Sequence, residues 1–274
     1  MEQTIRQTWA FVFRGYHLVR RYISWVIVWN FYAFVTSITI ALIGVAAHDY
    51  RLTLTLVIGA LLWNFLSNLY SEIAMSIAYE RWEGTLEYTF MAPVSRLIHL
   101  SGVSVFALCQ SLVTLVVVLT GLLLFTNIHL AGANLFGVFV VLLASTFAFV
   151  GLGLMAAVLP VMSPERGAEA THIFQGSLLL ISGIYYPVQV LPRWVQPLSH
   201  LSPATYTLSA CRKLVGIGNP ASTETHLVGA SLSDVVPELV TLLLMGAVLM
   251  PLGLWVFGRI EHWAKHTGKL KRTG

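Results

Sequence analysis

The fold of this chain is decided by a long segment without charge, SLVTLVVVLTGLLLFTNIHLAGANLFGVFVVLLASTFAFVGLGLM (residues 111–155). The segment lies within a run of 68 residues, 97–164, that contains no Asp, Glu, Lys or Arg. Because a helix needs about 20 apolar residues to cross a bilayer, this run has room for two crossings. The polar cluster TNIHLAGAN (126–134) predicts a break between them.

Runs without charge also lie on both sides of this segment, and they predict four more crossings. The chain is therefore expected to be a single all-α membrane domain over residues 1–274, with six transmembrane helices. These helices are expected at about 22–48, 52–78, 99–126, 134–162, 168–187 and 236–258. Continuous apolar runs disfavour the alternating pattern of barrel strands. The first run starts too far into the chain, and is too long, for a cleavable signal peptide.

The composition agrees with a protein whose solvent is lipid. The chain is 57% hydrophobic and only 10% charged, whereas a soluble domain is usually about 25% charged. The net charge of +4 could suggest binding to nucleic acid. The positions of the basic residues explain this excess better, and no nucleic-acid partner is expected.

Basic residues are concentrated on one side of the predicted helices. With six crossings, both termini and the loops after the second and fourth helices share a side. Of the sixteen Lys and Arg residues, only Arg51, Arg193, Arg212 and Lys213 lie on the other side. By the positive-inside rule, the twelve remaining residues mark the cytoplasm. The chain is expected in the cytoplasmic (inner) membrane as a multi-pass protein with both termini cytoplasmic.

The first 21 residues predict an amphipathic helix in the inner membrane interface. Ile5, Trp9, Val12, Phe13 and Tyr16 share one helical face, while Gln and Arg residues lie largely on the other. A basic and aromatic helix of this kind lies in the plane of the interface. A simple anchor and a contact with a partner are equally open as its role.

A polar stripe runs along the second predicted transmembrane helix. It consists of Asn64, Ser67, Asn68, Ser71 and Glu72. Polar groups in hydrocarbon usually face the bundle interior, a partner helix or a water-filled path. A translocation path or subunit interface and simple hydrogen bonding between helices are both open. Glu72, near the end of its helix, is better explained as a solvated carboxylate at the headgroups.

The external segment between the fifth and sixth helices, 187–234, begins with a part that is too apolar for a free loop. Pro187, Pro192 and Pro203 interrupt this part, and Trp194 suits a headgroup belt. Because proline is costly inside a helix, we expect short helices and turns at the outer interface.

The sequence lacks several common motifs for covalent chemistry and nucleotide binding. The sequence contains no G-x-S-x-G, no H-E-x-x-H and no G-x-x-x-x-G-K-[ST]. Glu169 and His172, and His262 and His266, have spacings that could serve a metal, but neither pair has a partner ligand set in the sequence. The chain is expected to be neither an enzyme nor a metal protein, and to bind no cofactor itself.

Between the second and third helices lies a charged motif, ERWEGTLEYTFMAPVSR (80–96). It resembles the cytoplasmic loop of the ABC-2-type transporter permeases. The matching residues are Glu80, Arg81, Gly84, Thr85, Leu86, Glu87, Ala92, Pro93, Val94, Ser95 and Arg96.

A second motif, SGIYYPVQVLPRWVQPLSHLSPATYTLSACRKL (182–214), resembles the external segment of the same family. Its matching residues are Ser182, Gly183, Tyr186, Pro187, Leu191, Pro192, Trp194, Pro203, Thr205, Tyr206 and Arg212. Two motifs in the right order make the resemblance specific to the family, although they do not indicate the cargo.

The resemblance implies a cytoplasmic coupling helix at about 84–92, which contacts an ATPase. Gly84 permits a sharp turn before this helix and Pro93 discourages its continuation. Glu83 and Glu87 offer acidic contacts, and Leu86, Phe90 and Met91 are expected to form an apolar knob for the groove of the partner. The full set of coupling residues is Glu80, Arg81, Glu83, Gly84, Thr85, Leu86, Glu87, Phe90, Met91, Pro93 and Arg96. An interfacial helix without a partner is the alternative.

The resemblance also implies an assembly of two permeases, as a homodimer or related heterodimer, with two ATPase subunits that bind ATP and Mg²⁺. The expected function is export of a small hydrophobic or amphipathic molecule, such as a drug, antibiotic or lipid, by alternating access. Export of a polysaccharide or lipid-linked glycan is an alternative, although the G-T-L-E run tells against it. A secondary transporter or channel working alone is the alternative from another class.

Overall fold

A computed structural model describes residues 2–92, 94–126, 128, 130–163, 166–220, 222–223 and 226–267. In this part of the chain every regular element is a helix and none is a strand. The elements are α1 (Glu2–Arg21), α2 (Ile23–Ala46), α3 (Tyr50–Trp82), α4 (Leu86–Met91), α5 (Arg96–Thr126), α6 (Leu135–Ala156), α7 (Val158–Met162), α8 (Gly167–Ile181), η1 (Val188–Val190), α9 (Gln196–Ser199), α10 (Pro203–Val215), η2 (Leu232–Val235) and α11 (Val236–His266).

Five helical segments among the described residues have the length and the apolar composition to cross a membrane. They are Ile23–Ala46, Tyr50–Trp82, Leu97–Thr126, Leu135–Met162 and Leu232–His266. The sixth crossing, expected at 168–187, corresponds to α8, which has only 15 residues. A helix of this length rises about 22 Å and is too short to cross the hydrocarbon alone. The count of six crossings therefore stays a prediction.

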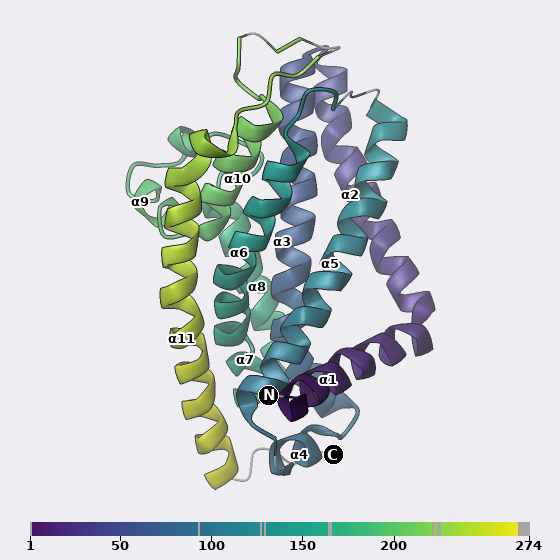
Figure 1. The fold of residues 1–274 in the computed structure, drawn as a ribbon, viewed down its shortest axis with the longest axis vertical. Coiled ribbons are helices and arrows are strands. Elements are labelled where there is room, and N and C mark those ends of the chain that lie inside the picture. The colour runs from purple at the N-terminus through teal and green to yellow at the C-terminus, as the bar shows by residue number, and fades with distance from the viewer. Residues whose placement is uncertain are drawn as a thin grey trace.

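The helices form a bundle with two distinct ends (Figure 1). At the lower end lie α1, α4, α7 and the end of α11, and we call it the α4 end. At the opposite end, the outer end, lie the turn between α2 and α3 and the long loop that precedes α11. The charged motif at 80–96 and the N-terminal helix therefore share one end of the molecule.

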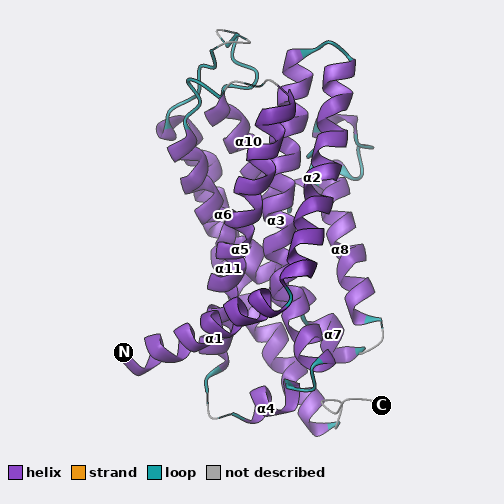
Figure 2. Ribbon diagram, turned by 90° about the vertical axis from the view of Figure 1, so that its right-hand side faces the viewer, coloured by secondary structure: helices purple, strands orange, loops and turns teal. Residues whose placement is uncertain are grey.

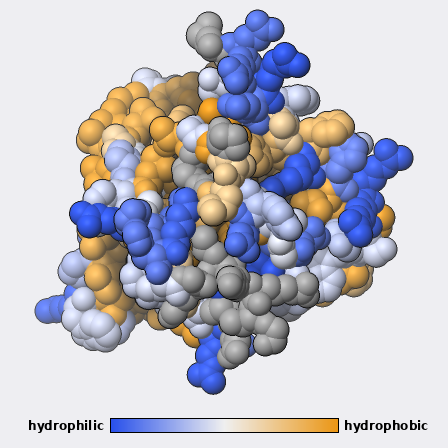
Figure 3. All heavy atoms as spheres, turned by 90° about the horizontal axis from the view of Figure 1, so that it is seen from below, coloured by the Kyte–Doolittle hydropathy of each residue, from blue (hydrophilic) through white to orange (hydrophobic). Residues whose placement is uncertain are grey.

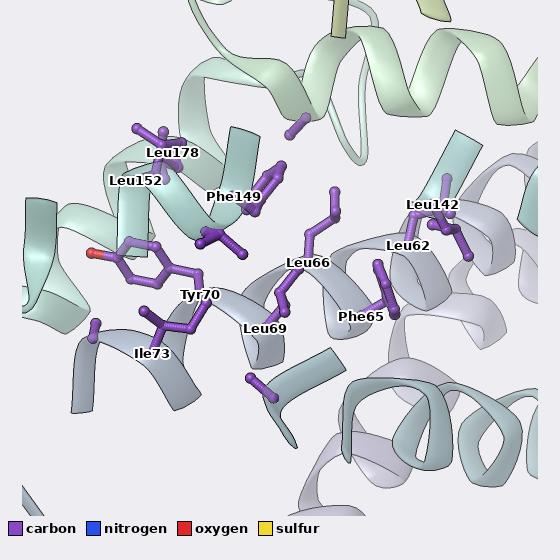
Figure 4. Close-up of a cluster of buried hydrophobic side chains, with 14 of the residues drawn as sticks. Leu62, Phe65, Leu66, Leu69, Tyr70, Ile73, Leu142, Phe149, Leu152 and Leu178 are labelled. Carbon is purple, nitrogen blue, oxygen red and sulfur yellow. The ribbon is translucent and has the colours of Figure 1, made fainter. Parts of the chain in front are cut away.

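Helix α3 is the centre of the bundle. In an apolar stretch of 18 residues within α3, 67% of the residues are buried, whereas only 11% are buried in the corresponding stretch of α2. Its large side chains Phe65, Leu69 and Tyr70 belong to one buried cluster with Leu142 and Phe149 of α6 and Leu178 of α8 (Figure 4). The helix that carries the polar stripe is thus also the helix that most others pack against.

Helices α6 and α11 approach each other closely through glycine. A Cβ at Gly151 would lie 2.5 Å from the backbone carbon of Leu249, and a Cβ at Gly253 would lie 2.5 Å from the carbonyl oxygen of Gly151. Lipid gives no hydrophobic drive for helices to associate, so close packing between small residues is what holds such pairs together.

The N-terminal helix lies across the bundle at the α4 end rather than along it (Figure 2). It rests on α5, where Phe11 meets the backbone at Gly102. Ile5, Trp9, Phe13 and Tyr16 remain exposed along one side of it. An exposed apolar row on a helix of this orientation is suited to the membrane interface.

We predict that Gly151→Ala destabilises the protein and that Gly258→Ala does not. The added methyl group at Gly151 meets backbone atoms of α11, whereas no atom lies within 4 Å of a Cβ at Gly258. Overpacking of this kind costs about 1–3 kcal/mol, which exceeds the gain of about 1 kcal/mol in helix propensity. Thermal unfolding of the two purified variants in detergent measures the difference. Equal melting temperatures would contradict the packing of α6 on α11.

Candidate functional site

The charged motif at 80–96 folds into the end of α3, a tight turn and the short helix α4. Gly84 has a φ of +73°, in the left-handed region that favours glycine. Its N–H donates to the carbonyl of Arg81 (3.1 Å), and the N–H of Thr85 donates to the carbonyl of Glu80 (2.8 Å). The sharp turn expected at Gly84 is therefore present and caps the C-terminal end of α3. Helix α4 starts directly after Thr85.

Helix α4 buries one side against its own chain. Leu86 is 1% exposed and Phe90 is 2% exposed. The ring of Phe90 meets that of Phe257 in α11 edge to face, with centroids 6.3 Å apart. The expectation that Leu86 and Phe90 form an apolar knob for a partner is therefore wrong. A helix of six residues has little stability of its own and is held here by tertiary packing.

The other side of α4 is open. Tyr88 is 79% exposed and Met91 is 72% exposed, and Glu83 and Glu87 are also exposed. These four residues, which we call the α4 face, combine two acidic side chains with a phenol and a thioether. Pro93, expected to stop the helix, lies outside the described residues, and Arg96 begins α5.

The first two residues of the motif point inward rather than outward. Glu80 is 4% exposed and Arg81 is 5% exposed. Glu80 accepts from Arg14 Nη2 of α1 at 2.6 Å and lies 3.2 Å from His99 Nε2 of α5. Arg81 Nη2 donates to the carbonyl of Val161 in α7 (3.3 Å). Both residues therefore tie the end of α3 to neighbouring helices and do not form part of a contact surface.

Seen from the α4 end, the molecule shows hydrophilic side chains spread among apolar ones (Figure 3). Arg6, Arg20 and Arg21 of α1 are exposed, and α1 lies at the same end of the molecule as α4. A mixed surface of this kind suits both headgroups and a protein partner.

The polar stripe of α3 is used largely for bonds between helices. Asn64 Nδ2 donates to Ser37 Oγ of α2 (2.8 Å), and Asn68 Nδ2 donates to Thr114 Oγ1 of α5 (3.3 Å). Ser71 Oγ donates to Gln175 Oε1 of α8 (3.1 Å). The stripe thus joins α3 to three different helices, which favours the packing interpretation for these three residues.

The other two members of the stripe are less engaged. Ser67 Oγ bonds within α3, to the carbonyl of Asn64 (3.4 Å). Glu72 is half-buried. The stripe is thus divided between bonds to other helices and partly open positions.

Polar groups are exposed on α8. His172, Gly176 and Ser177 are exposed, and a Cβ at Gly176 would meet no atom within 4 Å. Helix α2 exposes a row of aromatic rings, Trp25, Trp29 and Tyr32, whose neighbouring centroids lie 5.9 and 6.0 Å apart. We call the exposed sides of α2 and α8 the open faces, because both helices contact α3 yet leave these sides uncovered.

The segment after α8 does not stay at the surface throughout. Pro187, Pro192 and Trp194 are exposed, but Pro203 is buried at the first turn of α10 and Tyr206 is half-buried. Helix α10 is packed against α6, α11 and α3. The segment forms the short helices η1, α9 and α10, and its position at the outer interface stays a prediction.

Polar groups hold the start of this segment in place. Ser182 Oγ lies 2.7 Å from Ser202 Oγ, and Arg212 Nη2 donates to the carbonyl of Ile184 (2.9 Å). Burial lowers the pKa of Arg212 to about 10, so its guanidinium stays charged at neutral pH. These bonds close the chain between α8 and α10 into a compact hairpin.

Sequence reasoning missed His99, which is fully buried beside Glu80. It lies in the first turn of an apolar helix, three residues after Arg96, and its only signal in the sequence is a histidine placed just after the motif. Its meeting with Glu80 depends on how α5 packs on α3, which periodicity does not indicate.

We predict that Phe90→Ala loosens α4, because it removes the ring that anchors this helix to Phe257. Phe-to-Ala changes at buried sites cost about 3–5 kcal/mol. Amide hydrogen exchange over residues 86–91 should become faster, whereas Met91→Ala, on the exposed side of the same helix, should leave it unchanged. Equal exchange in the two variants would show that α4 is not held by this contact.

Comparison with known proteins places this arrangement in a family. The sequence model of the ABC-2 type transporter family matches residues 5–215, which is more than half of the chain. No curated protein matches the chain. The matched range includes the charged motif, the polar stripe and the hairpin through α10. Members of this family are membrane subunits that associate with an ABC ATPase. The chain therefore belongs to the ABC-2 type transporter family and is a multi-pass permease subunit of an ABC transporter.

Proposed function

We propose that this permease exports a small hydrophobic or amphipathic molecule across the cytoplasmic membrane by alternating access. Membership of the family supports a transport role that is driven by a separate ATPase subunit. The observation that carries the mechanism is the α4 face, an exposed set of side chains on a helix that is itself anchored within the bundle. A partner subunit that displaces such a helix would also displace the helices against which it packs.

The α4 end is proposed to face the cytoplasm. The basic residues Arg6, Arg20, Arg21, Arg259 and Lys265 all belong to α1 or to the last turns of α11. Both elements lie at the α4 end. The positive-inside rule therefore supports the orientation with the α4 face toward the compartment that holds ATP.

The ATPase is proposed to bind the α4 face, one copy to each permease. Glu83 and Glu87 supply negative charge, and Tyr88 and Met91 supply exposed apolar area. Aromatic residues and methionine are enriched at protein interfaces, and acidic residues select a partner with complementary charge. ATP and Mg²⁺ would be held by that partner, whose closure displaces α4.

The cargo path is proposed to lie between the open faces of two permease copies, which form a homodimer or a related heterodimer. Polar groups on α8, such as His172 and Ser177, are costly in contact with lipid tails. A second copy or a water-filled path would remove that cost. The aromatic row of α2 offers flat apolar surfaces of the kind that a hydrophobic or amphipathic cargo can contact.

We predict that the double variant Tyr88→Asp, Met91→Asp no longer co-purifies with the ATPase, because it replaces the apolar part of the α4 face with charge. The matched control is Trp194→Asp, which changes a residue that is 78% exposed in the hairpin segment after α8. The control should retain the complex. A stoichiometric complex with the double variant would refute the α4 face as the docking site.

We predict that Gly176→Leu abolishes transport while the chain still folds. The added side chain enters open space in a single copy, so only a partner copy or the cargo can meet it. Gly258→Leu, which also enters open space but lies on α11, should transport normally. The measurement is cargo-stimulated ATPase activity or export in reconstituted vesicles. Normal activity of Gly176→Leu would place the path elsewhere.

A further inference from the structure

One carboxylate at the α4 end is shared by three helices. Glu80 belongs to α3, and its Oε1 accepts from Arg14 Nη2 of α1 (2.6 Å) and lies 3.2 Å from His99 Nε2 of α5. The side chains of Glu80 and His99 are 5% and 1% exposed, and that of Arg14 is 38% exposed. The contact with Arg14 holds the middle of α1 against the end of α3, and the contact with His99 holds that end of α3 against the start of α5.

An aromatic ring completes this contact. Phe11 of α1 packs on the imidazole of His99 with ring centroids 4.7 Å apart, and the guanidinium of Arg14 lies 5.4 Å from the ring of Phe11. Glycine permits this approach, since a Cβ at Gly102 would lie 2.6 Å from Phe11 Cβ. Helix α1 is therefore packed against α5 through specific side-chain contacts and is not held by the membrane surface alone.

The backbone of the same glutamate holds the start of α4. The carbonyl of Glu80 accepts from the N–H (2.8 Å) and from Oγ1 (3.3 Å) of Thr85. A second link lies nearby, where Tyr22 Oη donates to Glu83 Oε1 (3.3 Å). Thus Glu80 joins α1 and α5 through its side chain and α4 through its main chain.

Stability alone does not account for this arrangement. Glu80 Oε2 and His99 Nδ1 are buried without a hydrogen-bond partner among the described residues, and each such atom costs about 1–3 kcal/mol. A buried ion pair often contributes no net stability when compared with apolar packing. What the three charged or polar groups do supply is one defined geometry between α1, α3 and α5.

We propose that Arg14, Glu80 and His99 are positioning residues that make α1 and α4 move as one rigid unit. The inference rests on the proposed function only in that α4 receives the push of the ATPase. The cluster then carries this displacement to α1 and, through the single residue Tyr22, to α2 with its aromatic row. None of the three residues contacts the partner or the cargo in this role.

The test measures the distance between α1 and α4 in the full chain. Spin labels are attached at Ala10→Cys and Tyr88→Cys, both exposed positions, after Cys109 and Cys211 have been replaced. In lipid nanodiscs the distance distribution should be narrow. Arg14→Met and His99→Leu should broaden it, while Arg14→Lys and His99→Gln, which keep an N–H donor, should restore it. Arg6→Met, an exposed arginine of the same helix, is the control and should change nothing.

Two outcomes would overturn the proposal. One is a distance distribution that is as narrow in Arg14→Met as in the labelled chain that keeps Arg14. The other is additive broadening in Arg14→Met combined with Glu80→Leu, because groups that share one interaction give non-additive effects. These measurements need neither ATPase nor cargo, so they test the cluster even if the proposed function fails.

A second measurement connects the cluster to transport. With the ATPase bound at the α4 face, nucleotide should leave the distance between labels at Ala10→Cys and Ala92→Cys, two exposed positions outside that face, unchanged in the parent chain. In Arg14→Met the same nucleotide should shift it, because α4 then moves without α1. An unchanged distance in Arg14→Met, in a complex whose ATPase does bind, would overturn rigid coupling while leaving the docking of the ATPase intact.

Discussion

Lipid offers no hydrogen bonds to a backbone, and this constraint governs the whole chain. Every segment that crosses the hydrocarbon must satisfy its own N–H and C=O groups, so the long apolar runs become helices. Among the described residues, the hairpin after α8 is one place where the helices are interrupted and polar side chains bond the backbone or one another. There Arg212 donates to the carbonyl of Ile184, and Ser182 and Ser202 pair with each other.

The same constraint explains which parts of the structure could be predicted. Apolar runs and turn residues are local signals, and they indicate helices near 22–48, 52–78 and 99–126 that agree with α2, α3 and α5. Burial is not local. Whether α8 is a full crossing or a short helix depends on the hairpin that folds back beside it. The periodicity of the sequence does not indicate that the chain turns back there. The short length of α8 therefore could not be predicted from the sequence.

The charged motif shows the same division. Gly84 and its neighbours indicate a turn followed by a short helix, and the structure has both. Hydrophobic residues on so short a helix have two possible uses, a partner or the parent chain. The choice depends on Phe257, which lies more than 160 residues further on in the sequence. For the same reason Glu80 looked like a contact residue, because its charge is visible in the sequence and Arg14 and His99 are brought to it only by folding.

Helix α4 therefore separates two tasks that are usually mixed in one surface. Leu86 and Phe90 fix where the helix sits, while Glu83, Glu87, Tyr88 and Met91 are exposed and form the proposed docking surface. Since the second set contributes little to packing, it is free to change in evolution without loss of the fold. With the α4 face as the proposed docking site, a permease could acquire a new ATPase through a few surface substitutions while its bundle stays as it is. Lineages of such transporters would then diverge in subunit pairing faster than in architecture.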